Sequence, residues 1–445
     1  MMKKIFSFIY KCHKWFGIPL AVMFIMWYVS GIVMLYHQFP RLTPSTTPVE
    51  EVSLASLSEV WKEVPDTFST CRIFFSGKKP LVKAGGETYG AFTPTYGDLR
   101  DIASSFRTQV ARVDTLADID KWIPFNQLMP HLPIYRVVGA DDSYTYVSSK
   151  TGEVIGRNTR VGRAWAWIGA LPHYVYITPI RRDVGLWRDV VIWMSGLSTI
   201  SVIFGLVVAV RFLVMRRSMH VFKNRWWQLH YSWGLVFGLF MLAFIFSGMM
   251  SLAKIPDWII KPAEMPEGKE MVVKADVDLT MLPARMSSAR ITASPVPMIE
   301  TRAGEETIIT SINRCRPLDF SPEAMRPVVE RTTGEKVNDI TRVGDDIFYH
   351  APVEGYRAVT KHFTVYWNDR GFFRVFDARG KAQAICYRFL HTMDIPGLNR
   401  VEWLHQIFMW VVLLGGLVIT VTGTVLSVRA CRRHHKQRRH KIYWK

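Results

Sequence analysis

The sequence predicts an integral membrane protein whose four transmembrane helices form a bundle of two parallel repeats, with two α+β domains outside the cytoplasm. Three observations lead to this fold class. Four apolar stretches have the length, about 20 residues, that a helix needs to cross the hydrocarbon core of a bilayer. Lys and Arg collect on one side of all four stretches, and the two halves of the chain repeat one pattern of His, Ser, Gly and Arg.

The expected elements follow in chain order. The transmembrane helices are expected at residues 1–37, 187–214, 226–253 and 402–428, with a cytoplasmic loop at 215–225 and a basic tail at 429–445. Residues 38–186 and 254–401 are expected to form the two outer domains, each ending in a short surface segment that carries one histidine, His173 or His391. The first stretch is no cleaved signal peptide, because it is too long and lacks a cleavage site of small residues.

The distribution of charge gives the orientation. A formal net charge of +19 raises the question of nucleic-acid binding, but the basic residues gather at the N-terminus, in the 215–225 loop and in the C-terminal tail. These segments share one face of a protein with four spans, so the positive-inside rule places them and both termini in the cytoplasm. The outer domains are then periplasmic. Nucleic acid is set aside as a partner, and the tail is expected to meet anionic lipid headgroups of the bilayer.

The helices read as two copies of one unit. Residues 13–17 and 230–234 both have the pattern His-x3-Gly, and in each copy Ser-Gly begins 17 residues after the histidine. Ahead of the second and fourth helices, His173 and His391 are each followed by Gly at +32 and Arg at +38. An even number of spans separates the copies, so they have the same orientation. Parallel repeats of this kind usually pack about an axis along the membrane normal.

Each outer domain carries a hairpin signal. Residues 144–155 alternate in polarity and turn at Lys-Thr-Gly, and residues 362–367 with 372–380 have the same strand-like character. Segments 40–48 and 255–268, which are rich in Pro or polar residues, indicate linkers.

Several chemistries lack their sequence signature. Two of the five cysteines are cytoplasmic in this topology, which leaves a bridge between Cys71 and Cys315 open but predicts no disulfide framework. Covalent c-type haem is excluded, because no Cys-x-x-Cys-His motif occurs. No Gly-x-Gly-x-x-Gly follows a cytoplasmic strand, so a flavin or nicotinamide domain is not expected. Electrons would have to come from a separate donor, a quinone or a redox protein.

Four histidines occupy repeat-matched positions. His13 and His230 lie at the cytoplasmic ends of two helices, and His173 and His391 lie on the outer side. A titratable ring beside a membrane segment is costly without a partner, which makes each histidine a candidate functional residue. A single histidine at an interface is more often an anchor, but four at repeat-matched positions favour ligands. Two imidazoles from different helices of a bundle can ligate one haem iron and leave no open coordination position. We predict that each of the two pairs binds one haem.

The spacing favours two haems over one. Residues 13–37 span about 36 Å at 1.5 Å per residue, comparable to a bilayer with its interfaces, so a relay needs a cofactor near each face. His37 and His405 are weaker candidates, because Lys254 and Trp187 stand at the matching positions. A transition-metal site is the rival use of the outer histidines, although no carboxylate or Cys accompanies them at ligand spacing.

Four segments match the pattern of a known family. They are His13–Gly17 through Ser30-Gly31, Trp226–His230 through Ser247-Gly248, Leu390–Pro396, and the turn at Val147–Ile155, which is similar to a PepSY hairpin. In these segments the chain resembles the PepSY-associated transmembrane family, whose members include haem-b ferrisiderophore reductases of the bacterial inner membrane. The resemblance implies PepSY-like outer domains and haem b. It also implies periplasmic reduction of a ferric siderophore, which weakens a complex built on hard oxygen ligands.

Two other functions remain open. The outer domains can be the working part, as a membrane-anchored module that binds a peptide or inhibits a periplasmic protease. Alternatively, the protein can be a sensor or an assembly partner of an iron or copper uptake system. Haem content distinguishes both from a reductase.

Overall fold

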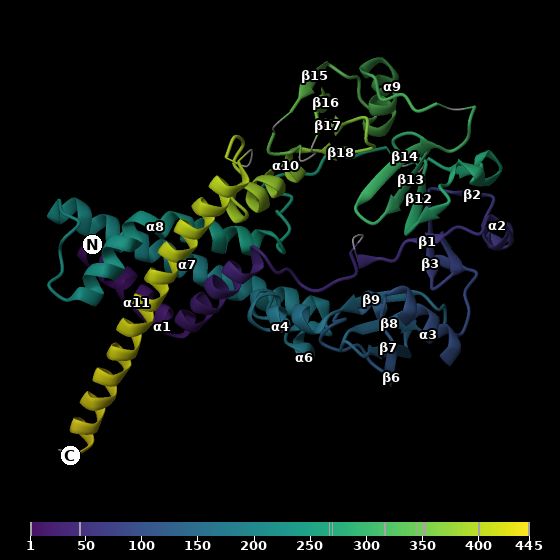
Figure 1. Cartoon of the computed structure of the whole chain (residues 1–445). Coiled ribbons are helices and arrows are strands. Elements are labelled where there is room, and N and C mark those ends of the chain that lie inside the picture. Colours follow the sequence, from purple (N-terminus) through teal and green to yellow (C-terminus); the bar gives the residue numbers. More distant parts are fainter. Residues whose placement is uncertain are drawn as a thin grey trace. The chain divides into compact units, whose positions relative to one another are not determined.

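The computed structural model describes residues 2–43, 46–266, 268, 270–315, 317–344, 346–349, 353–398 and 401–443. The chain forms two compact units. We call them the helical unit, residues 1–39, 165–261 and 379–445, and the sheet unit, residues 40–164 and 262–378. Figure 1 shows their elements in chain order.

Four long helices build the helical unit (Figure 1): α1 (Met2–Met34), α7 (Val184–Arg216), α8 (Arg225–Met250) and α11 (Glu402–Tyr443). All four are long and apolar enough to cross a membrane, which confirms the predicted number of spans among the described residues. Asp183 caps α7 by accepting a hydrogen bond from the Leu186 amide, and Asn224 caps α8 by accepting from the Trp226 amide. These polar caps satisfy amides that the first turn of a helix leaves unpaired.

The packing order places α1 and α8 on opposite corners of the bundle. Each of them packs against both α7 and α11. The centre is apolar and includes Leu20, Phe24 and Tyr28 of α1, Met241 of α8 and Leu413 of α11. Side chains that point inward from α1 and α8 therefore meet across the bundle.

Short helices lead into α7 and α11. The chain enters α7 through α4 (Arg160–Ile168), α5 (Ala170–His173) and α6 (Thr178–Arg181), and it enters α11 through α10 (Ala378–Ala384) and a π-helix, η5 (Ile385–His391). The expectation of surface segments needs correction here. α5 packs against α1 and η5 packs against α8, so His173 and His391 turn toward the bundle, where their rings find hydrogen-bond partners.

A six-stranded antiparallel sheet joins the two long connections, the one between α1 and α7 and the one between α8 and α11. Its order is β14-β13-β12-β3-β4-β5. The first connection supplies β3 (Thr70–Ser76), β4 (Lys79–Ala84) and β5 (Glu87–Tyr89), and the second supplies β12 (Ser288–Thr292), β13 (Met298–Ala303) and β14 (Glu306–Ser311). One face is buried around Ile73, Ile291 and Ile299, close to α2 (Leu54–Glu63).

Two short two-stranded ribbons also pair a strand of the first connection with a strand of the second. They pair β1 (Glu50–Glu51) with β11 (Arg285–Met286), and β2 (Thr67–Phe68) with β10 (Val272–Val273). The expectation of one domain per connection did not include these shared sheets. Cys71 is a buried free thiol of β3 and Cys315 is an exposed one, so the bridge left open between them is not formed.

Each connection also forms a four-stranded antiparallel module. The first module has β6 (Val110–Leu116), β7 (Ile134–Gly139), β8 (Tyr144–Ser148) and β9 (Val154–Asn158) with α3 (Tyr96–Ser105). The second has β15 (Asp339–Val343), β16 (Gly355–Val359), β17 (Thr364–Trp367) and β18 (Phe373–Phe376) with α9 (Pro322–Thr333). The predicted hairpins are present as β8–β9 and β17–β18.

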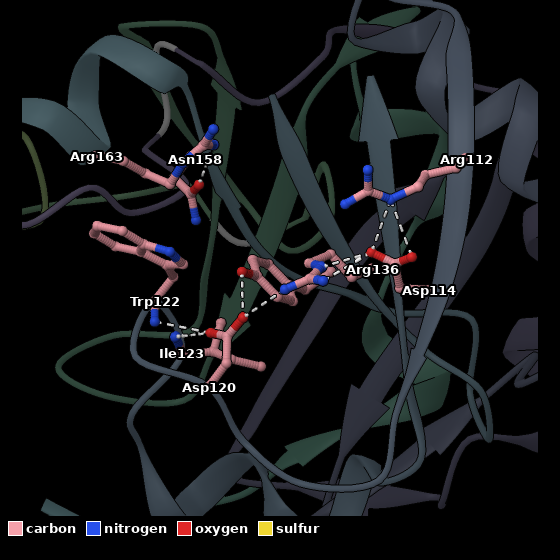
Figure 2. Close-up of polar contacts among 9 residues, drawn as sticks. Arg112, Asp114, Asp120, Trp122, Ile123, Arg136, Asn158 and Arg163 are labelled. Atoms are coloured by element: carbon pink, nitrogen blue, oxygen red, sulfur yellow. Dashed lines mark hydrogen bonds and ion pairs between the residues drawn. The ribbon is translucent and has the colours of Figure 1, made fainter. Parts of the chain in front are cut away.

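Both modules contain the same polar triad of Tyr, Asp and Arg. In the first, the Tyr146 hydroxyl donates to Asp120 at 3.0 Å and Arg136 donates to the same carboxylate at 3.3 Å. Asp120 also accepts from the amides of Trp122 and Ile123, as Figure 2 shows. In the second, Tyr366 donates to Asp346 at 3.1 Å and Arg357 lies 3.9 Å from it.

Replacing Asp120 with Ala is expected to lower the free energy of unfolding by about 3 kcal/mol, because Tyr146 and Arg136 would lose a charged acceptor in a largely dehydrated place. Calorimetry of the full chain in detergent measures this change. The control is Asp66→Ala, whose side chain is 95% exposed. Equal effects of the two substitutions would show that the triad does not stabilise the module.

Candidate functional site

The four repeat-matched histidines meet as two facing pairs in the helical unit. The ring centres of His13 on α1 and His230 on α8 are 6.2 Å apart. Those of His173 and His391 are 6.1 Å apart. Two imidazoles on opposite sides of one metal, with bonds of about 2 Å, have ring centres about 6 Å apart. Both pairs therefore have the separation that two histidines would need to hold one iron between them.

Backbone carbonyls orient the His13–His230 pair. His13 Nδ1 lies 2.8 Å from the Ser201 carbonyl, and His230 Nδ1 lies 3.1 Å from the Ile419 carbonyl. A carbonyl can only accept, so Nδ1 carries the proton in both rings. Nε2 then keeps its lone pair, which is the form in which a histidine binds a metal.

Serine hydroxyls orient the His173–His391 pair. Ser30 donates to the Trp27 carbonyl at 3.1 Å, so its oxygen accepts from His173 Nδ1, also at 3.1 Å. Ser247 donates in the same way to the carbonyl of Phe244, and its oxygen lies 3.0 Å from His391 Nδ1. The outer rings therefore also leave Nε2 unprotonated.

Burial keeps the outer rings neutral. It lowers the pKa of His173 to about 4, and the facing His391 adds to this effect. Burial lowers the pKa of His391 as well. Neutral imidazole is the metal-binding form, so this environment favours ligation.

Each ring also lies against a helix glycine. A Cβ atom at Gly205 would lie 2.6 Å from the nearest His13 ring atom, and one at Gly423 would lie 3.1 Å from His230. The corresponding distances are 3.5 Å from Gly248 to His391 and 3.9 Å from Gly31 to His173. Gly205, and to a smaller extent Gly423, therefore provides space for a ring that a side chain would fill, whereas the other two distances are ordinary contacts.

A large cavity surrounds the His13–His230 pair. It has a volume of about 670 Å³, which is within the usual range for ligand pockets. Its walls are mainly apolar and include Phe24, Trp227 and Met241. Lys14 and Arg429 also line it, and no Asp or Glu is among its described lining residues. The donor pair, the glycine space and the cavity together fit a planar tetrapyrrole with acidic side groups.

The weaker candidates join neither pair. His37 stacks on Trp165, with ring centres 4.2 Å apart and planes 10° apart. His405 Nε2 lies 3.1 Å from the Thr392 carbonyl, so that nitrogen carries a proton. Trp187 occupies the position that matches His405 in the repeat. It donates its indole N–H to the Tyr174 carbonyl.

The rival use of the outer histidines is a site for a non-haem metal ion. In the described part of the chain, no group of three or more His, Cys, Asp or Glu side chains is placed to hold a metal ion. Two histidines suffice for haem iron, because the porphyrin supplies the other four ligands. The side chains of His434, His435 and His440, expected to be solvated, lie outside the described residues.

Sequence reasoning missed two parts of this site. The sequence shows the Ser-Gly pairs and the glycines at +32 only as parts of the repeat. In the structure, Ser30 and Ser247 contact His173 and His391, and Gly205 and Gly423 lie against His13 and His230. Lys14 and Arg429 were interpreted as topology signals, although both line the cavity.

Comparison with known proteins agrees with the motifs. A family model described as the PepSY-associated TM region matches residues 10–430. The match includes both histidine pairs and most of each long helix. No curated protein matches the chain.

Proposed function

Since this chain belongs to the PepSY-associated TM family, we propose that it is a haem-b electron-transfer protein of the bacterial inner membrane that reduces ferric siderophores on the periplasmic side. The observation that carries the proposal is the presence of two histidine pairs with ring centres 6.2 and 6.1 Å apart. Iron with two histidine ligands has no open position for oxygen, which suits electron transfer.

The contacts support a bundle of two parallel repeats. His13 rests on Gly205 of α7, and His230 rests on Gly423 of α11, which is the matching position in the second repeat. His173 and His391 contact the matching residues Ser30 and Ser247. Each repeat therefore orients its own two histidines, and the two repeats meet where the rings face one another.

The proposed topology puts one cofactor near each face. With both termini in the cytoplasm, the His13–His230 pair is on the cytoplasmic side and the His173–His391 pair is on the periplasmic side. Bound haem would supply reversible one-electron transfer. Lys14 and Arg429 offer positive charge to its two propionates at the cytoplasmic cavity. A quinone or a redox protein is the proposed electron donor.

The alternative functions leave this arrangement without a role. A peptide-binding or protease-inhibiting anchor, or an assembly partner for metal uptake, needs no inward-facing histidine pairs. Nor does it need a cavity of about 670 Å³ around one of them. Their signature would be full activity in protein without haem.

The proposal is tested on protein purified in detergent. We expect a Soret band and, after anaerobic reduction, re-oxidation of the haem on adding a ferric siderophore. One ferrous ion should be trapped by a ferrous-specific chelator for each electron lost, because each ferric ion takes one electron. The metal-free siderophore and its redox-inert gallium complex are the controls. Protein that is correctly folded but lacks a Soret band would favour the alternatives.

A further inference from the structure

Two arginines face one another at the centre of the six-stranded sheet. Arg72 of β3 and Arg290 of β12 are direct cross-strand partners, and both are exposed. Directly opposed residues of an antiparallel pair have Cβ atoms about 5 Å apart, and like charges there destabilise the sheet. This position is therefore unfavourable for two guanidinium groups unless an anion lies between them.

The two arginines are equivalent by sequence. Arg72 lies in Ser69-Thr-Cys-Arg-Ile73 and Arg290 in Ser287-Ser-Ala-Arg-Ile291. They are 218 residues apart, the same separation as between His173 and His391. The shared sheet thus brings one basic position from each half of the chain to its centre, where a single ligand can contact both.

The neighbouring charges leave the pair positive. Lys83 is the next cross-strand partner of Arg72, and Glu300 is the next partner of Arg290. Glu300 is already bound by Arg302 at 2.6 Å, and Lys83 is 3.4 Å from Glu153. Among the described residues, neither Arg72 nor Arg290 forms an ion pair with a carboxylate.

One further carboxylate lies nearby. Glu50 lines a small cavity together with Arg72 and Phe74. Burial raises the pKa of Glu50, and the positive charges of Lys78 and Arg285 act against this shift, so Glu50 has cationic neighbours besides Arg72. Arg72 itself lies over the Phe74 ring, with its guanidinium carbon 5.3 Å from the ring centre.

The two modules cover the ends of this face and leave its middle open. At one end, Ser76 donates to the Gly152 carbonyl in the β8–β9 turn of the first module. At the other end, Met298 and Ile309 pack into the core of the second module. Arg72 and Arg290 lie on the strands between these contacts.

We propose that Arg72 and Arg290 form a binding site for anionic ferric chelates, such as those with catecholate or carboxylate ligands. The inference rests on the proposed function, whose substrate class it narrows. Guanidinium groups present planar sets of N–H donors to oxygen anions, and two of them suit a chelate with several anionic oxygens. A chelate of neutral or positive charge gains nothing from this pair.

The test measures binding without electron transfer. Full-length protein in detergent is titrated with gallium tris-catecholate, which is multiply anionic, and with a gallium trihydroxamate, which has no negative charge. The wild-type protein should bind the first more tightly. Arg72→Gln and Arg290→Gln should each weaken that binding about tenfold, to a similar extent because the residues are equivalent. A variant with Lys in place of both arginines should bind the tris-catecholate more tightly than the Gln variants but less tightly than the wild type.

The control is Arg374→Gln in β18. Arg374 is also exposed, and its guanidinium carbon is 5.7 Å from the centre of the Phe372 ring. If this variant weakens binding as much as the others, or if the two gallium complexes bind equally, the proposal is wrong. Displacement by millimolar phosphate would overturn the assignment to a chelate.

Haem content separates this proposal from the proposed function. Loss of the preference for the anionic complex in protein that keeps its haem and still reduces ferric siderophore would overturn only the arginine site. Protein that lacks haem and still binds the anionic complex through both arginines would overturn the reductase function and retain the site.

Discussion

Replacing His13 with Ala is expected to remove one of the two proposed haems from the purified protein and to leave the other in place. The substitution deletes one ligand of the His13–His230 pair, and His230 alone cannot provide six-coordinate iron. The outer pair has separate supports, Ser30 for His173 and Ser247 for His391. His230→Ala should have the same effect, because the two residues would hold the same proposed iron.

Haem per protein, measured as the pyridine haemochrome, checks this expectation. The variants His173→Ala and His391→Ala should lose the other proposed haem and keep the one at the His13–His230 pair. In vesicles, any of the four should stop electron transfer from an internal donor to an external ferric siderophore, although dithionite still reduces the remaining haem.

His220→Ala is the matched control, since His220 is exposed on the connection between α7 and α8. An unchanged haem content in the His13→Ala variant would show that His13 and His230 do not bind a haem as a pair. Loss of haem in His37→Ala or His405→Ala would point to a different ligand set.

The repeat in the sequence predicts which histidines face one another, because parallel repeats about one axis would bring equivalent residues together across it. The ring centres of His13 and His230 lie 6.2 Å apart. Local sequence could not have made this choice. His37, three residues beyond the end of α1, is as good a candidate by residue type, yet its ring stacks on Trp165.

The shared sheet could not be derived in the same way. A strand such as β3 has the same alternating pattern whether it pairs with a strand of its own domain or with β12, far along the chain. The alternating pattern predicts which face of the strand is buried, but it does not predict the strand with which it pairs. The cross-strand pairing of Arg72 with Arg290 therefore follows from the structure and could not be predicted from the sequence.

The glycine at position 205 provides a test that leaves every proposed ligand in place. Gly205→Ala is expected to weaken binding of the cytoplasmic-side haem, because the new Cβ would lie 2.6 Å from the His13 ring. Overpacking at a tight site costs about 1–3 kcal/mol, which corresponds to about 5- to 150-fold in affinity. The His13 ring would have to move away from the Ser201 carbonyl. That carbonyl accepts the hydrogen bond from Nδ1 and thereby leaves Nε2 as the nitrogen that can bind iron.

The four glycines predict an order of effects. The distance from the added Cβ to the ring rises from 2.6 Å at Gly205 to 3.1 Å at Gly423, 3.5 Å at Gly248 and 3.9 Å at Gly31. Loss of haem affinity should be largest for Gly205→Ala and smaller for Gly423→Ala, whereas alanine at the other two positions places Cβ at ordinary van der Waals distance and should leave haem bound. Haem titration of the apoprotein measures each value.

Gly196→Ala is the control that makes this order decisive. Gly196 lies on α7 like Gly205, but it is not among the described lining residues of the cavity, and a Cβ there would lie 3.5 Å from the Met249 sulfur, an ordinary contact distance. Alanine also favours a helix over glycine by about 1 kcal/mol, so this variant should fold and bind the haem at the His13–His230 pair as well as the wild type. Equal losses from Gly196→Ala and Gly205→Ala would mean that haem binding responds to any change in the helices. A loss confined to Gly205 would tie the cofactor to the orientation of His13, because that ring is the group the new methyl would displace.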